Sequence, residues 1–161
     1  MGQETLIEAI RAKLGDAVEG AADSFGDPVL ILRPAAVRTA MAMLREPPFD
    51  YALLLDLTCV DFAAAEGRFE LVYHLYAMSR NVRLRLKASL PAADPAVETL
   101  VGLWKNAEWL EREVFDMFGV RFEGHPYLKR ILTYEGFEGH ALRKSYPWRL
   151  EQPRIPLKGD V

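Results

Sequence analysis

The sequence predicts an α+β fold in which helices pack on a mostly antiparallel mixed sheet. The first observation is the order of the periodic segments. Apolar residues recur at helical spacing, then in two short strand-like segments, then at helical spacing again, and then in three alternating segments. The second observation is that short loops join the last three segments, which requires antiparallel pairing. Together they indicate an α-β-β-α-β-β-β order and a two-layer domain with the helices on one face of the sheet.

Two helices and two short strands are expected before the central sheet. The first helix begins at a capping box, Thr5-Leu-Ile-Glu8, and ends near Gly15. Residues 29–32 are a clear strand candidate, and residues 17–19 are a weaker one. The second helix begins at Pro34, because proline is preorganised for the first helical position, and it ends before two consecutive prolines.

Three strands are expected at residues 52–60, 69–76 and 82–87, joined as a meander. The first is apolar on both faces apart from Asp56 and Thr58, which favours a central strand. The third alternates apolar side chains with basic ones, which predicts a half-buried strand with a basic outer row. That row consists of Arg83, Arg85 and Lys87.

Further helices are expected after the meander. Asp94 and Pro95 suit an N-cap and a first helical position. The apolar face of that helix would be Val97, Leu100, Val101 and Trp104. The next helix starts near Trp109 and stops at Gly119, since glycine takes the left-handed cap conformation without penalty. Pro126 would then open a short helix carrying Leu128, Ile131 and Leu132.

The helix that stops at Gly119 carries an unusual set of charges. Arg112 lies within four positions of four carboxylates, those of Glu108, Glu111, Glu113 and Asp116. The residues alone leave three interpretations open: an amphipathic helix with a solvated charged face, an interface helix neutralised by a partner, or a metal site. The metal site would use Asp116, His125 and His140, although their spacing matches no usual ligand pattern.

The last part of the chain loses its periodicity. We expect a core domain at residues 1–135 and an extended, proline-containing tail at 136–161. Residues 1–120 carry a net charge of −6 and residues 121–161 a net charge of +3. The tail also holds seven large apolar side chains, which cannot form a core of their own. It must therefore lie across its own domain or along a partner.

Composition excludes several classes of function. The net charge of −3 gives no support to nucleic-acid binding, and no apolar run is long enough to span a membrane. The single cysteine, Cys59, excludes an internal disulfide and a cysteine-ligated cluster, so a reducing, cytoplasmic compartment is expected. No phosphate-binding glycine motif or flavin site is visible. His74 lies on a strand face, where a structural role is expected.

At the charged helix the sequence resembles the C subunit of respiratory complex I, the proton-translocating NADH:quinone oxidoreductase. The resemblance rests on Glu111-Arg112-Glu113, Asp116-Met-Phe-Gly119, Gly124-His125-Pro126 and Arg130-Ile131-Leu132. It continues into Gly139-His140, Leu142-Arg143-Lys144 and Tyr146-Pro147, and covers residues 50–147. The residues expected to serve assembly are Glu111, Arg112, Glu113, Asp116, Gly119, Gly124, His125, Pro126, Arg130, Arg143, Lys144, Tyr146 and Pro147.

The resemblance implies a non-catalytic subunit of a membrane complex. The complex uses NADH, FMN, iron–sulfur clusters and quinone, whereas this chain would bind none of them. Its partners would be other peripheral-arm subunits, chiefly the quinone-binding subunit and the iron–sulfur subunits. It would lie on the cytoplasmic side of the bacterial inner membrane without spanning it. Arg112 would hold the carboxylate cluster together.

Two alternatives accompany this interpretation. The first is the equivalent subunit of a related membrane-bound hydrogenase or another quinone-linked complex. The second is an independent metal-dependent hydrolase built on Asp116, His125 and His140.

Overall fold

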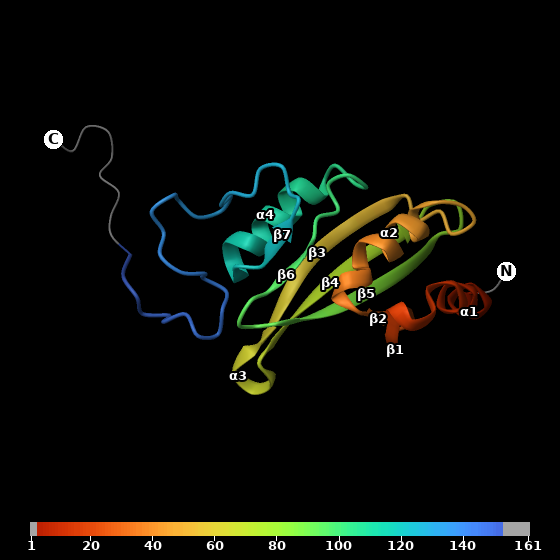
Figure 1. The fold of residues 1–161 in the computed structure, drawn as a ribbon, viewed down its shortest axis with the longest axis horizontal. Helices are drawn as coiled ribbons and strands as arrows, with labels where there is room; N and C mark the ends of the chain where they lie inside the picture. Colours follow the sequence, from red (N-terminus) through yellow and green to blue (C-terminus); the bar gives the residue numbers. More distant parts are fainter. Residues whose placement is uncertain (1–2, 153–161) are drawn as a thin grey trace.

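The computed structural model describes residues 3–152 (Figure 1). The helices are α1 (Gln3–Leu14), α2 (Val37–Arg45), the short α3 (Ala63–Glu66) and α4 (Ala107–Phe118). The strands are β1 (Val18–Ser24), β2 (Asp27–Leu32), β3 (Leu53–Phe62), β4 (Arg68–Ala77), β5 (Val82–Pro91), β6 (Ala96–Glu98) and β7 (Arg121–Glu123). Apart from the single turn of α3, the first seven elements follow the predicted α-β-β-α-β-β-β order.

Five strands form one mixed sheet in the order β1-β2-β5-β4-β3. β3, β4 and β5 pair antiparallel in sequence order, so the predicted meander is confirmed. β2 pairs parallel with β5 and antiparallel with β1. This single parallel pair makes the sheet mixed and mostly antiparallel, which confirms the predicted fold class.

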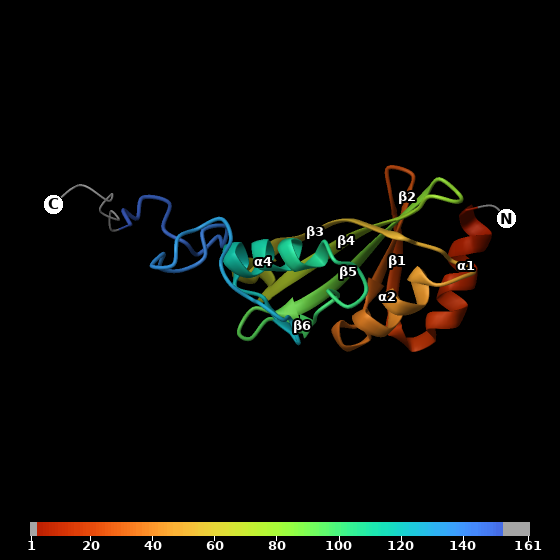
Figure 2. The ribbon, with the colours of Figure 1, turned by 90° about the horizontal axis from the view of Figure 1, so that it is seen from above.

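The helices cover one face of this sheet. On β4 the side chains of Phe69, Leu71, Tyr73 and Leu75 are buried and point to that face, whereas the alternate residues are mostly half-buried. Figure 2 shows α1 and α2 along one side of the strands. α4 joins the same layer, because the Phe118 ring packs edge-on against Phe69 at 6.5 Å between centroids. The apolar core therefore lies between the sheet and these three helices.

The prediction of a central strand at residues 52–60 was wrong. β3 is the outer strand of the sheet and pairs only with β4. Its apolar residues Leu53, Leu55 and Val60 are exposed, so an apolar pattern on both faces here marks an uncovered surface. The outer edge is partly satisfied by side chains, because Trp104 Nε1 donates to the Ala52 carbonyl and Asn106 Nδ2 to the Leu54 carbonyl.

The prediction of a helix that begins at Asp94 was also wrong. The chain instead forms β6, which pairs parallel with β7. The pairing extends beyond the strands, since the Thr99 N–H donates to the Glu123 carbonyl and the Arg121 N–H to the Pro95 carbonyl. Arg121 also forms an ion pair with Asp94, whose side chain would have capped the expected helix. Backbone pairing with a distant segment thus outweighs the local helical signal.

From Gly136 to Gln152 the chain forms turns without a helix or strand, as expected from its lost periodicity. This segment loops out beyond α4, at the opposite end of the molecule from α1 (Figure 1). The last part of the predicted tail, residues 153–161, lies outside the described residues. Among the helices that the structure does describe, none has the length and apolar character to cross a membrane.

Candidate functional site

The carboxylates of α4 are turned towards the protein interior. Glu111 and Asp116 are both 0 % exposed, whereas the apolar Trp109 on the same helix is 62 % exposed. Glu113 faces solvent. An amphipathic helix with all its charges solvated is therefore wrong, because two of the four acidic groups are buried among partners.

Asp116 binds a loop that lies more than a dozen residues further along the chain. Its Oδ2 atom accepts the backbone N–H groups of Ile131, Leu132 and Thr133, at 3.0, 2.9 and 2.8 Å. Its Oδ1 atom accepts the Thr133 hydroxyl and Nη1 of Arg130, the latter at 2.8 Å. One side chain thus fixes four consecutive residues.

These bonds also set the protonation of Asp116. Burial by itself would raise the pKa of the carboxyl group. The hydrogen bonds from Thr133, Arg130 and the Leu132 N–H more than offset that effect, so the pKa lies well below its usual range. Asp116 therefore remains an anion that compensates the Arg130 guanidinium.

The short helix predicted after Pro126 does not form. Three consecutive N–H groups that a helix would direct to its own carbonyls converge on Asp116. Hydrogen bonds to a side chain of α4 thus replace the bonds that a helix would make within this segment. Ile131 and Leu132 consequently lie at the surface, where both are exposed.

Glu111 binds the segment that leads from β6 towards α4. Its two oxygens accept the Leu100 N–H and the Thr99 hydroxyl, both at 2.6 Å. Burial raises the pKa of Glu111 to about 7, against the opposing effect of these two donors and of Arg38. The buried hydroxyl of Tyr73 has no hydrogen-bond partner within the described residues, and its pKa is raised by burial and by the Glu111 charge.

His125 lies next to Glu111, but both of its ring nitrogens bind backbone groups. Its Nδ1 atom accepts the Tyr127 N–H at 3.0 Å, so the ring proton must be on Nε2. That proton is donated to the Glu108 carbonyl at 3.1 Å. The separation of 4.0 Å between His125 Nε2 and Glu111 Oε2 is therefore a contact between two groups that are satisfied elsewhere.

Arg112 does not hold the carboxylate cluster together, so that prediction was wrong. Its guanidinium donates to the carbonyls of Lys129 and Arg130, at 3.0 and 3.1 Å, and lies over the Tyr127 ring. The helix directs this side chain outwards over the loop, while Glu111 and Asp116 point inwards. Arg112 and Asp116 thus hold the same loop from two sides, one through its carbonyls and the other through its N–H groups.

The following segment is attached to the C-terminal end of α4. Three carbonyls that the helix leaves unsatisfied at this end accept hydrogen bonds from the segment. The Met117 carbonyl accepts from the Leu142 N–H, the Phe118 carbonyl from Arg143 Nε, and the Asp116 carbonyl from His140 Nδ1. Cations and donors are favoured at a helix C-terminus for this reason. Gly119 has φ of +75°, and a β-carbon there would lie 2.5 Å from both Arg143 and His140. A side chain at this position would have to displace Arg143 and His140, whose hydrogen bonds hold the segment on the helix.

Two further contacts complete the attachment. The Lys144 N–H donates to the buried Asp61 carboxylate of β3 at 2.7 Å. Tyr146 stacks on Phe137 at 5.8 Å between centroids, and its hydroxyl accepts Nε2 of Gln152 at 2.6 Å. The remaining residues of the resemblance, Gly124, Pro126 and Pro147, are exposed turn residues, and Gly124 has φ of +80°.

The arrangement does not bring together the three residues of the metal-site interpretation. Asp116 is fully engaged by N–H groups and Arg130, and His140 binds its backbone carbonyl. His125 binds the Glu108 carbonyl and lies beside Glu111, nearer to the N-terminus of α4. In the part of the chain that the structure describes, no group of three His, Cys, Asp or Glu side chains is placed to hold a metal ion.

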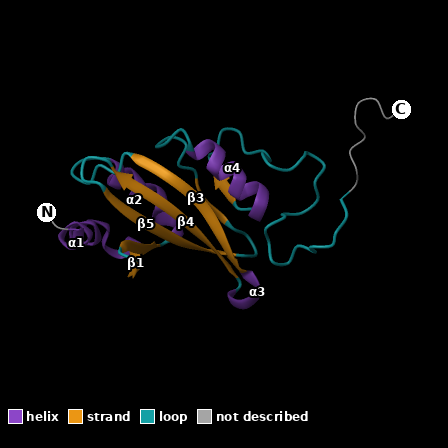
Figure 3. Ribbon diagram, turned by 180° about the vertical axis from the view of Figure 1, so that it is seen from behind, coloured by secondary structure: helices purple, strands orange, loops and turns teal. Residues whose placement is uncertain are grey.

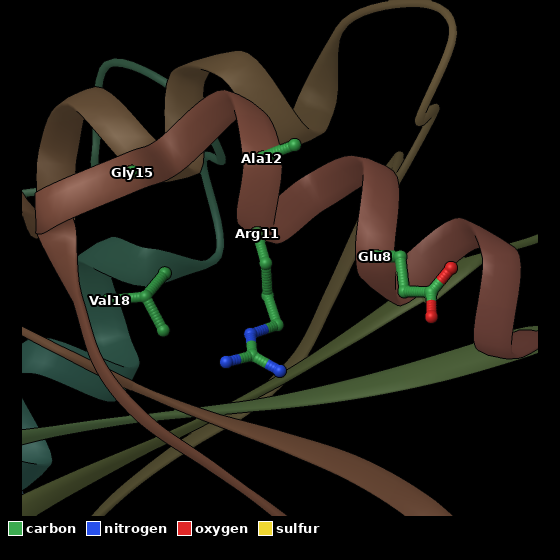
Figure 4. Close-up of a pocket in the computed structure, with 5 residues that line it drawn as sticks. All are labelled: Glu8, Arg11, Ala12, Gly15 and Val18. Carbon is green, nitrogen blue, oxygen red and sulfur yellow. The ribbon is translucent and has the colours of Figure 1, made fainter.

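One surface depression, of about 400 Å³, borders this network, because Arg130 and Thr133 line it and both are bound to Asp116. Two other depressions are shallow surface features. One lies beside α1 and is lined by Glu8, Arg11, Ala12, Gly15 and Val18 (Figure 4). Another, of about 440 Å³, passes over β6 and β7 between Arg38 and Pro126. In neither does a nucleophile face a base. Cys59 is buried, and burial raises the pKa of its thiol to about 12, so it is inert as a nucleophile.

Comparison with known proteins identifies the family. Residues 30–152 match the family described as respiratory-chain NADH dehydrogenase, 30 Kd subunit. The chain belongs to this family. It is 42 % identical over 157 residues to the NADH-quinone oxidoreductase C subunit of Roseiflexus sp. (strain RS-1), covering 97 % of this chain and 90 % of that protein. It is also 42 % identical to the corresponding C subunit of Thiobacillus denitrificans over 152 residues, covering 89 % and 76 %.

Solved structures support the same fold. A trypsin-resistant fragment of Nqo5 superposes with a TM-score of 0.66 at 29 % identity, covering 80 % of this chain and all of that one. A chain of the membrane-bound sulfane sulfur reductase, an archaeal respiratory membrane complex, superposes with a TM-score of 0.68 at 26 % identity, covering 86 % and 79 %. The predicted resemblance to the C subunit of complex I is confirmed, and the chain is a subunit of NADH:quinone oxidoreductase.

Several residues of this network escaped sequence reasoning. Thr99 and Thr133 supply hydroxyls to Glu111 and Asp116, and Asp61 holds Lys144. Threonine is too common to signal a buried hydrogen bond. Asp61 gave a signal that could have been used, since an aspartate among the apolar residues of a strand needs a buried partner.

Proposed function

We propose that this chain is a brace in the peripheral arm of NADH:quinone oxidoreductase, with no redox centre of its own. It would contact the quinone-binding subunit and the iron–sulfur subunits on the cytoplasmic side of the membrane. The relatives that are C subunits of this oxidoreductase support the role, and so does the internal arrangement of α4. The residues that carried the resemblance serve the assembly of the chain itself and of its interfaces.

One observation carries the proposal. Asp116, Glu111 and Arg112 all direct their polar atoms at backbone or hydroxyl groups of this chain. A catalytic site needs reactive groups that face a substrate, whereas these groups are consumed in fixing loops. The same contacts give residues 125–146 a defined shape before any partner arrives, which lowers the entropic cost of binding.

The segment that they fix has the surface of an interface. Leu142, Trp148 and Leu150 are exposed on the C-terminal segment, where no regular structure shields them. Large apolar side chains that are exposed on one segment favour a protein contact there. A division into a core at 1–135 and an arm at 136–161 suits this role. The trypsin resistance of the Nqo5 fragment supports a compact body in this family.

The cofactors of the complex would be held by other subunits. We propose that NADH, FMN, iron–sulfur clusters and quinone bind outside this chain, which positions the subunits that hold them. The chain offers one cysteine, and that cysteine is buried in the core, so thiolate ligation of a cluster has no support here. A purified chain should be colourless.

The experiment is affinity purification of the tagged chain from its native membranes. The expected result is co-purification of subunits with flavin, iron–sulfur clusters and NADH:quinone activity. Recovery of the chain alone would contradict the proposal. The likeness to the sulfane sulfur reductase complex favours one alternative, a related membrane-bound complex. A co-purified complex that reduces its acceptor only with a donor other than NADH would support that alternative.

A further inference from the structure

The face of the sheet opposite the helices is open and chemically uneven. Figure 3 views the molecule from this side, with the strands in front of α2. Three rows of side chains form it, and we call them together the open face. The rows are Leu53, Leu55, Asp56, Thr58 and Val60 on β3; Tyr76, His74, Val72 and Glu70 on β4; and Arg83, Arg85, Lys87 and Ser89 on β5.

The β5 row concentrates positive charge that the protein neutralises only at one end. Lys87 binds Glu70 at 2.8 Å, and Glu70 also binds Arg68 at 3.2 Å. Within the described residues, neither Arg83 nor Arg85 has a carboxylate within ion-pair distance. Like charges at alternate positions of one strand repel each other, so this arrangement costs stability in the free chain.

Arg85, in the middle of that row, has a donor atom without a hydrogen-bond partner in the described structure. This atom, Nε, is buried. Its cross-strand neighbour is His74, whose pKa is lowered by burial and by the Arg85 charge, against the opposing effect of the Asp56 and Asp27 carboxylates. A buried donor without a partner costs free energy until an acceptor reaches it. Arg85 is therefore a half-buried cation that the described chain leaves without an ion pair and without a hydrogen bond at Nε.

The β3 row offers the complementary half of a binding surface. Leu53, Leu55 and Val60 are exposed apolar residues on this outermost strand. They run alongside the basic row, with the mixed β4 row between them. A partner segment lying along the sheet would thus meet an apolar strip on one side and, on the other, two arginines that form no ion pair within the described chain.

We propose that the open face docks an extended acidic segment of another subunit of the complex, with carboxylates on Arg83 and Arg85 and apolar side chains on the β3 strip. The charge pattern selects acidic protein as the occupant, because arginine pairs with carboxylates through two parallel hydrogen bonds. This surface is separate from the α4 network, and the inference rests on the proposed function, a place in a multisubunit complex.

Photo-crosslinking in the assembled complex tests it. The photoreactive residue p-benzoylphenylalanine replaces Thr58, an exposed residue of the open face, in the tagged chain. Crosslinked peptides are identified by mass spectrometry after purification of the complex. The expected product joins this position to one acidic segment of a different subunit. Adding Arg85→Glu should lower its yield about tenfold, since like charges across an interface disfavour binding.

The matched control changes the same charge on the helical side. Arg11→Glu with Arg45→Glu alters two exposed arginines of α1 and α2 and should leave the crosslink intact. A crosslink to lipid, to a segment without carboxylates, or to no subunit would overturn the proposal. Failure of the chain to co-purify would overturn the proposed function and also remove the partner that this inference requires.

Discussion

Asp116 and Thr133 are 17 positions apart, yet the Asp116 carboxylate accepts both the backbone N–H and the hydroxyl of Thr133. This pairing joins a buried helix to a loop without secondary structure of its own. Through the neighbouring bonds to Ile131 and Leu132 it replaces the hydrogen bonds that a helix would have made. Together with Arg112, the Asp116 side chain fixes the loop that leads into the C-terminal arm.

The junction after α4 should tolerate no β-carbon. Gly119→Ala places a methyl group against Arg143 and His140 at a φ of +75°, so it should destabilise the protein by more than the roughly 1–2 kcal/mol that a left-handed residue costs. Gly67 is a matched control, because its φ is +66° and its added β-carbon would meet nothing within 4 Å. Urea unfolding of both variants measures the difference. Equal losses would show that the Arg143–His140 contact does not constrain this position.

Arg112 should stabilise the loop after Pro126 through its hydrogen bonds to two backbone carbonyls. Arg112→Ala removes two partly exposed hydrogen bonds, to Lys129 and Arg130, and should lower the free energy of unfolding by about 1–2 kcal/mol. Arg112→Lys keeps the charge but loses the planar fork, so it should recover less than half of that loss. Hydrogen exchange of residues 127–131 should accelerate in both variants. A loss as large as that of a buried ion pair would restore the interpretation in which Arg112 compensates carboxylates.

Glu111 should make stability fall as the pH rises towards neutrality. Its folded-state pKa, about 7, lies above its ordinary value of 4.5. Stability from the protonated group is therefore fully present below the unfolded-state pKa and is lost as the pH rises through the folded-state value. Glu111→Gln should remove this pH dependence of stability, which amounts to roughly 3 kcal/mol between the unfolded-state and folded-state pKa values. Denaturant unfolding at a series of pH values measures it. An unchanged slope in the variant would contradict the assignment.

The thiol of Cys59 should react only when the chain unfolds. The side chain is buried in β3, and burial raises its pKa to about 12, so little thiolate forms at neutral pH. Alkylation by iodoacetamide should follow the unfolded fraction as urea increases. Rapid labelling of the native protein would indicate an opening of β3 that the described structure does not contain.

Local patterns were sufficient for the main fold. Alternation in β4 and β5 gave the meander, and apolar residues at helical spacing gave α1 and α2, because burial of one face leaves a periodic pattern. The capping box predicted at Thr5 was wrong, since α1 begins at Gln3 and Thr5 lies inside it. The position of β3 at the edge left no such pattern. A sequence does not distinguish an exposed leucine from a buried one, so the apolar residues of this segment, Leu53 and Leu55 among them, predict a central strand.

Segments stabilised by distant partners were not predictable from the sequence. Residues 95–104 have a helical apolar pattern, but pairing between β6 and β7 overrides it. The loop after Pro126 fails to become a helix because Asp116 takes its N–H groups. The family motif correctly marked α4 as important, although the residues alone could not show that its carboxylates point inwards.

The most direct test of the brace is Asp116→Asn, compared with Glu113→Gln on the exposed face of the same helix. The first removes the charge that Arg130 and three N–H groups require, and breaking such a buried pair costs about 3–5 kcal/mol. The second changes the net charge by the same amount without a buried partner. The measurement combines native-gel assembly of the complex with hydrogen exchange of residues 130–146. We expect Asp116→Asn to lose protection throughout the arm and to fail to assemble, while Glu113→Gln assembles normally. Full assembly and unchanged protection in Asp116→Asn would contradict the brace.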